Sequence, residues 1–87
     1  MLVDIRKLPG TEITEVRFKL KDLKKEQDYE DLTSIAYAVT TAYCFEPMEL
    51  ASLEFEEFLK SLKPRTTYLI QAGLENSRPI FAYGAAN

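Results

Sequence analysis

The chain has 87 residues, of which 46% are hydrophobic and 29% charged, with a formal net charge of −3. This length fits one small domain spanning residues 1–87, and the apolar fraction excludes a disordered chain. The acidic balance disfavours nucleic-acid binding. The single cysteine excludes an intramolecular disulfide. No apolar run is long enough to span a membrane, and no signal-peptide pattern opens the chain. We therefore expect a small soluble domain in the cytoplasm.

The first third of the chain has the pattern of a β-hairpin. Residues 2–7 alternate loosely between apolar and polar side chains and predict a short strand. Pro9-Gly10, shortly after them, is a strong turn signal. Residues 13–20 alternate more strictly, as a half-buried strand does. The apolar face of that strand holds Val16, Phe18 and Leu20. The alternative is a single strand here, with residues 2–7 as a loose arm.

Residues 28–45 predict the main helix, after a highly charged stretch at 21–31 that is a linker or the first helical turns. One apolar stripe contains Tyr29, Leu32, Ile35, Ala36, Val39, Ala42 and Tyr43. The opposite side is also uncharged, and it contains Thr33, Ser34, Tyr37, Ala38, Thr40, Thr41, Cys44 and Phe45. A surface helix normally has a charged back. Either this helix is covered on both sides within the monomer, or its second face meets another chain.

Pro47 favours the first turn of a second helical segment, which runs to about residue 63, before Pro64. One continuous helix would place Leu50 and Leu53 opposite its apolar face. A break near Leu53 removes this conflict, and we favour it. The break leaves a short helix at 47–52 and a second helix at 54–63.

The C-terminal part has strand composition. Residues 66–72 predict a strand and residues 73–78 a turn. Residues 79–83 predict a last strand at a sheet edge, because they begin with proline. The competing interpretation is a helix over 66–76, and the last four residues predict a loose tail.

Together these elements predict an α+β fold. It has an N-terminal β-hairpin or single strand, central helices at about 28–45 and 47–63, and C-terminal β-strands or a hairpin. A core this small only just offsets the entropy of ordering the chain, so a homo-oligomer is one expected source of stability.

Charge is segregated along the chain. Residues 17–25 are mostly basic, whereas residues 26–57 contain acidic residues and no basic one. Two explanations stay open. The basic strand end lies near the acidic helix starts, or the chain presents separate acidic and basic docking surfaces, which steer association.

The residues needed for common catalytic and metal sites are missing. There is no histidine for a nucleophile–base pair or a zinc site, and the three glycines are too scattered for a phosphate-binding loop. Glu54, Glu56 and Glu57 cluster where acids complement a helix dipole rather than form a catalytic pair. Cys44 is interpreted as a small apolar residue. We therefore expect no enzyme activity, no catalytic residue, no cofactor and no metal site.

Protein binding remains the expected activity, since aromatic residues on helix faces are typical interface anchors. The expected partner-binding residues are Tyr37, Thr41, Cys44, Phe45, Leu50, Leu53, Glu54 and Glu57. The apolar members of this set are equally compatible with a place in the core.

Two segments resemble a known family. Residues 10–23 (GTEITEVRFKLKDL) are similar to the opening of small tail assembly chaperones of long-tailed bacteriophages, where an amphipathic strand leads into an aspartate–leucine pair. Residues 45–59 resemble that family's segment of proline, acid, two leucines, acid and aromatic. The resemblance covers about residues 10–63. It implies a non-enzymatic virion-assembly protein of the host cytoplasm that shields an apolar tape measure protein. The client-facing residues would then be Tyr37, Phe45, Leu50 and Leu53.

Two other functions fit the same residues. A small inhibitor or adaptor would use the acidic segment 26–57 to bind a host enzyme, a defence complex or a toxin, and its binding would weaken steeply with salt. A structural subunit of a virion or filament would pack the uncharged back of the main helix against a neighbouring copy.

Overall fold

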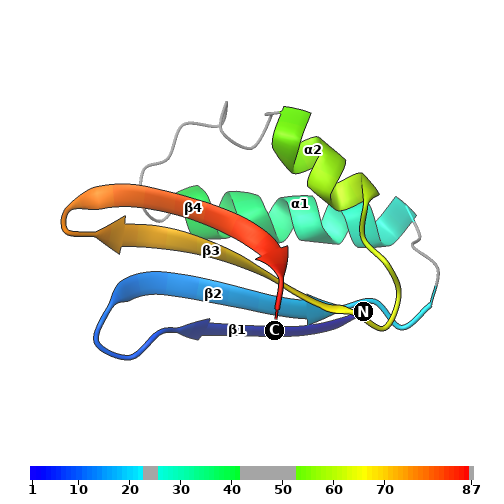
Figure 1. The fold of residues 1–87 in the computed structure, drawn as a ribbon, viewed down its shortest axis with the longest axis horizontal. Helices are drawn as coiled ribbons and strands as arrows, with labels where there is room; N and C mark the ends of the chain where they lie inside the picture. Colours follow the sequence, from blue (N-terminus) through cyan, green and yellow to red (C-terminus); the bar gives the residue numbers. More distant parts are fainter. Residues whose placement is uncertain (23–25, 42–52, 87) are drawn as a thin grey trace.

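The computed structural model describes residues 1–22, 26–41 and 53–86, and it has the expected α+β fold. Two β-hairpins flank two helices in the sequence and join into one four-stranded sheet (Figure 1). The strand order is β1-β2-β3-β4, and every neighbouring pair is antiparallel. The elements are β1 (Leu2–Lys7), β2 (Glu12–Lys19), α1 (Glu26–Thr41), α2 (Leu53–Lys60), β3 (Thr67–Glu75) and β4 (Arg78–Ala85).

The N-terminal hairpin is confirmed, and residues 2–7 are a paired strand rather than a loose arm. Thr11 donates its backbone N–H to the Leu8 carbonyl at 3.2 Å, which closes a turn with Pro9 and Gly10 at its centre. Gly10 has a φ of 72°, a conformation that glycine adopts without steric cost. The Pro-Gly pair therefore fixes the register of β1 on β2.

The C-terminal hairpin is also confirmed, but its bounds differ from the prediction. Residues 73–75 continue β3, and the turn is limited to Asn76 and Ser77, which both have positive φ. A two-residue turn of this kind matches the twist of the strands, so pairing runs up to it. The predicted loose tail is wrong for residues 84–86, because Gly84 pairs with Leu69 and the chain stays bonded to β3.

The core lies between one face of the sheet and the two helices. In the strand register Val16 lies beside Ile70, and Ile70 lies beside Tyr83, so these side chains share one face. Val16 and Ile70 are fully buried there. The core cluster combines residues of β2 and β3 with residues of both helices, including Leu32 and Ala36 of α1. The sheet therefore uses one face for packing.

Helix α1 begins at Glu26, two residues before the predicted start, and residues 42–45 lie outside the described residues. The predicted stripe faces the core, since Leu32, Ala36 and Val39 are buried. Thr40 was expected on the back of the helix, but it is only 2% exposed. Its hydroxyl donates to the Ala36 carbonyl at 2.8 Å, which satisfies the buried polar group within the helix.

Helix α2 begins at Leu53, where the sequence indicated a break, whereas residues 47–52 lie outside the described residues. It ends at Lys60, earlier than the predicted residue 63. The Ser61 hydroxyl donates to the Phe58 carbonyl at 2.8 Å, and the Lys63 backbone N–H donates to the Tyr68 hydroxyl at 2.9 Å. These bonds take up groups that a longer helix would use, and the chain turns into β3.

An aromatic cluster attaches α2 to the sheet. Phe55 lies 5.4 Å from Phe81 and 5.2 Å from Tyr83, measured between ring centroids. Phe58 lies 4.7 Å from Tyr83 and 5.9 Å from Tyr68. Helix α2 has only eight residues, too few to be stable alone in water, so these ring contacts hold it in place.

Phe55→Ala should therefore lower the free energy of unfolding by about 3–5 kcal/mol, because it deletes a buried ring. Phe58→Ala should cost less, since Phe58 is only partly buried. Urea denaturation followed by circular dichroism measures both. Leu53→Ala is the control in the same helix and should stay within about 0.5 kcal/mol, because Leu53 is exposed. A Phe55→Ala cost below about 1 kcal/mol would contradict this packing.

Two strand glycines provide a matched comparison. A Cβ at Gly73 would overlap the Glu12 carbonyl oxygen of the neighbouring strand, whereas a Cβ at Gly84 would have no atom within 4 Å. Gly73→Ala should therefore destabilise the fold clearly in thermal unfolding. Gly84→Ala should be neutral or stabilise it by up to about 1 kcal/mol, because it reduces the freedom of the unfolded chain. Equal melting temperatures for the two variants would show that the strands do not approach closely at Gly73.

Candidate functional surfaces

Two predicted apolar partner-binding residues lie on the surface of the helix layer. Tyr37 of α1 is 41% exposed, and Leu53 at the start of α2 is 69% exposed. Glu54 and Glu57, the predicted acidic members, are exposed on α2 beside Leu53. Tyr37 and Leu53 are therefore not core residues, and their role in binding stays a prediction.

The other predicted partner-binding residues are not described. Cys44, Phe45 and Leu50 lie outside the described residues, and so does the side chain of Thr41, the last residue of α1. The structure therefore does not bring the predicted set together as one surface.

Strand β1 carries a second apolar surface, which the sequence reasoning missed. All six of its residues are exposed, and its apolar side chains are Leu2 (55% exposed), Val3 (40%) and Ile5 (53%). Ile5 pairs with Val16 and so points to the helix side of the sheet, yet neither of the described helices buries it. Figure 1 shows β1 at the edge of the sheet that lies away from both helices. The loose alternation of residues 2–7, with apolar residues on both faces, was the signal for this.

The open face of the sheet holds a buried carboxylate. Glu15 of β2 is only 3% exposed. Its carboxylate accepts a hydrogen bond from Gln71 Nε2 at 3.0 Å, and its Oε2 lies 3.3 Å from Arg6 Nε and 3.6 Å from Arg17 Nη2. Arg17 is the first residue of the basic segment 17–25, and it forms an ion pair with Glu15 of its own strand.

This network sets the pKa of Glu15. Burial raises the pKa, but the hydrogen bond from Gln71 and the positive charges of Arg17 and Arg6 outweigh burial and hold the Glu15 pKa below its usual value. Glu15 is therefore a charged, fully partnered group that ties β1, β2 and β3 together. Its environment favours a structural role, because every partner stabilises the ionised form.

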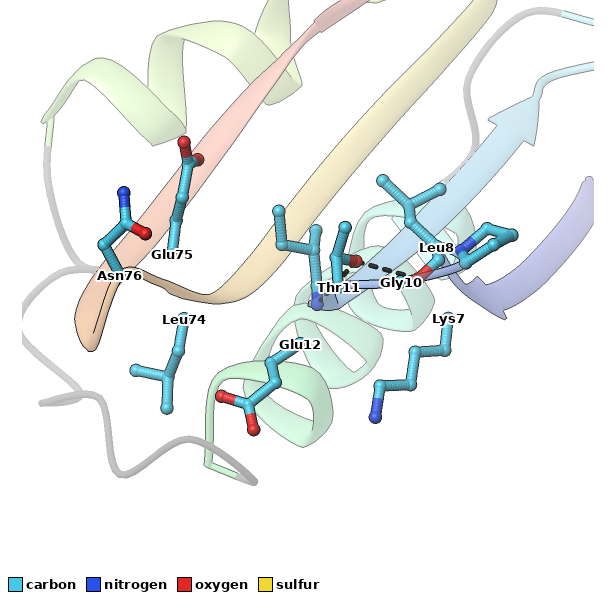
Figure 2. A pocket seen from close by; sticks show the side chains of 10 residues that line it. Lys7, Leu8, Gly10, Thr11, Glu12, Leu74, Glu75 and Asn76 are labelled. Atoms are coloured by element: carbon cyan, nitrogen blue, oxygen red, sulfur yellow. Dashed lines mark hydrogen bonds between the residues drawn. The ribbon is translucent and has the colours of Figure 1, made fainter.

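An open hollow lies between the two hairpin turns (Figure 2). Lys7, Glu12 and Leu74 point to the same side of the sheet, whereas Glu75 points to the other side. At the N-terminal hairpin turn, Thr11 donates its hydroxyl to the Leu8 carbonyl at 2.8 Å. The charged side chains diverge rather than converge on one point, so the hollow does not form a catalytic constellation.

In the described ranges (1–22, 26–41 and 53–86), no group of three side chains suited to holding a metal ion occurs. No helix in these ranges is long and apolar enough to cross a membrane.

Comparison with known proteins assigns no relationship. No family model, no curated protein and no solved structure matches this chain.

The Glu15 network makes stability pH-dependent. Because the folded-state pKa is lowered, the contribution of Glu15 is complete above its unfolded-state pKa of about 4.5 and is lost as the pH falls through the folded-state value. Glu15→Gln should lower the free energy of unfolding by about 1–3 kcal/mol at pH 7. It should also weaken the loss of stability toward acidic pH, as measured by urea unfolding at several pH values. Glu12→Gln, an exposed position in the same strand, is the control. If Glu15→Gln still lost stability toward acidic pH as steeply as the unchanged chain, this would contradict the role of Glu15 in that pH dependence.

Proposed function

We propose that this chain is a non-enzymatic protein-binding module whose helix layer contacts a protein partner. Leu53 carries this proposal, because it is the most exposed of the large hydrophobic side chains among the described residues, at 69%. Tyr37 is a second exposed apolar side chain on the same layer. Such side chains gain free energy when a partner removes them from water.

The charge around Leu53 suits a surface that is free before it binds. Glu54, Glu56 and Glu57 are exposed on α2, and Glu56 forms a surface ion pair with Lys60 at 3.2 Å. Exposed acids keep an apolar surface soluble while it is uncovered. The arrangement therefore supports reversible binding of an apolar segment.

A phage tail assembly chaperone is the narrower form of this proposal. It rests on the resemblance of residues 10–63 and on the exposure of Leu53 and Tyr37, two of the expected client-facing residues. In this role the chain acts in the host cytoplasm and shields an apolar, tape-measure-like client.

An inhibitor or adaptor of a host protein is the second candidate. The observation that favours it is that acidic side chains are exposed on both helices, namely Glu26, Glu30, Glu54, Glu56 and Glu57. A basic groove on a partner would bind these side chains largely through charge, and salt would weaken that binding.

Affinity purification of the tagged chain from its native cells, at low and high salt, separates these functions. A large, apolar, helical partner that survives high salt supports the chaperone. A host protein that is lost at high salt supports the inhibitor. Recovery of the chain alone contradicts partner binding and favours a structural subunit of a virion or filament.

The double variant Leu53→Asp with Tyr37→Asp should fold normally but bind the recovered partner at least about tenfold more weakly, equal to about 1.4 kcal/mol. Both side chains are exposed, so the core is left intact. Ser34→Asp is the control, because it adds a charge to an exposed position of α1 without removing apolar surface. Isothermal titration calorimetry measures the affinity, and unchanged binding by the double variant would exclude this surface.

A further inference from the structure

Strand β1 is a free sheet edge. Its six residues are exposed, and no other strand pairs with it on that side among the described residues. We propose that β1 pairs antiparallel with β1 of a second copy of this chain, which joins two four-stranded sheets into one of eight strands. A free edge presents unpaired N–H and C=O groups, which another strand can satisfy. The opposite edge, β4, contains Pro79, which has no N–H to donate.

The backbone of β1 offers a regular set of groups to this second copy. Leu8, directly after β1, donates its N–H to the Ile13 carbonyl at 2.9 Å, and this pair continues the β1–β2 register. Bonding direction alternates along an antiparallel strand, so every second residue back from Leu8 also faces β2. The residues between them face the free edge, and they are Val3, Ile5 and Lys7. None of the three is proline.

Charge selects the register of the pairing. With Ile5 opposite Ile5 of the second copy, Asp4 lies opposite Arg6 of that copy, and the two-fold axis repeats the same ion pair. Centring the pairing on Asp4 would place two Asp4 side chains together, and centring it on Arg6 would place two arginines together. Like charges directly opposite each other are destabilising. The register centred on Ile5 is therefore complementary.

The same register covers exposed apolar surface. The two Ile5 side chains, each 53% exposed in the monomer, come to lie against each other on the helix side of the sheet. On the open side, Arg6 already lies 3.3 Å from Glu15. A guanidinium group has five N–H donors, so Arg6 can keep Glu15 and also bind Asp4 of the second copy. The Glu15 network then continues across the interface between the two β1 strands.

The pairing leaves the helix layer uncovered and so does not depend on the proposed function. A two-fold axis perpendicular to the sheet places both helix layers on the same face. Two copies of the surface around Leu53 would then point in one direction.

Sedimentation equilibrium of the purified chain over a concentration series tests the pairing without any other protein. We expect a monomer–dimer equilibrium. Ile5→Pro should remain folded and become monomeric, because its N–H faces the free edge and does not bond to β2. Ile5→Ala is the matched control, since it shortens the same side chain, keeps the N–H and should still dimerise. A monomeric chain at all concentrations, or a dimeric Ile5→Pro variant, would overturn the proposal.

Charge exchange tests the register independently. Asp4→Arg and Arg6→Asp should each raise the dimer dissociation constant at least about tenfold, because each places like charges opposite each other. An equimolar mixture should regain dimer, since the two variants are complementary. Urea unfolding checks that each variant folds, because Arg6 also contacts Glu15. Two folded variants that fail to associate when mixed would refute the register.

Discussion

The structure depends on one geometric constraint: the two described helices pack on one face of the four-stranded sheet and leave its first strand, β1, exposed. Val16 and Ile70 are fully buried under the helices, whereas Ile5, in the same row of the register, is 53% exposed. The core is therefore centred on β2 and β3. The exposure of Val3 and Ile5 follows from this arrangement, because the described helices leave β1 uncovered. Tyr37 and Leu53 are exposed because none of the described residues packs behind the helix layer at these positions.

On the face of the sheet opposite the described helices, charged and polar partners stabilise a buried carboxylate. Glu15 is almost fully buried on the face of the sheet opposite the described helices, because Arg6, Arg17 and Gln71 surround it. A carboxylate is stable in such a place only when its charge and its lone pairs are matched. The network links three strands and so adds cohesion on the face of the sheet opposite the described helices.

On the helix side of the sheet, the aromatic cluster holds α2 against the strands. Phe55 and Phe58 connect a helix of eight residues to Tyr68, Phe81 and Tyr83 of the C-terminal hairpin. This attachment fixes Leu53 at the surface, two residues before the buried Phe55 in the first turn of α2. The position of the proposed binding surface is thus a consequence of core packing, since the residues that anchor α2 decide which side of it faces water.

Local signals in the sequence predict the type of the described elements, with a loose arm at 2–7 and a helix at 66–76 as the alternatives. Alternation at residues 13–20, Pro9-Gly10, the uncharged stripe around Leu32 and the β-branched and aromatic residues after Thr66 are local signals, and they predicted the strands, the first turn and the helices. Local signals do not predict which apolar residues remain exposed, because that depends on packing between distant parts of the chain. Exposure of Ile5 and Leu53, and burial of Glu15 and Thr40, depend on what packs against each position from elsewhere in the chain. Periodicity assigns a residue to a face, but the extent of the covering layer determines whether that face meets water.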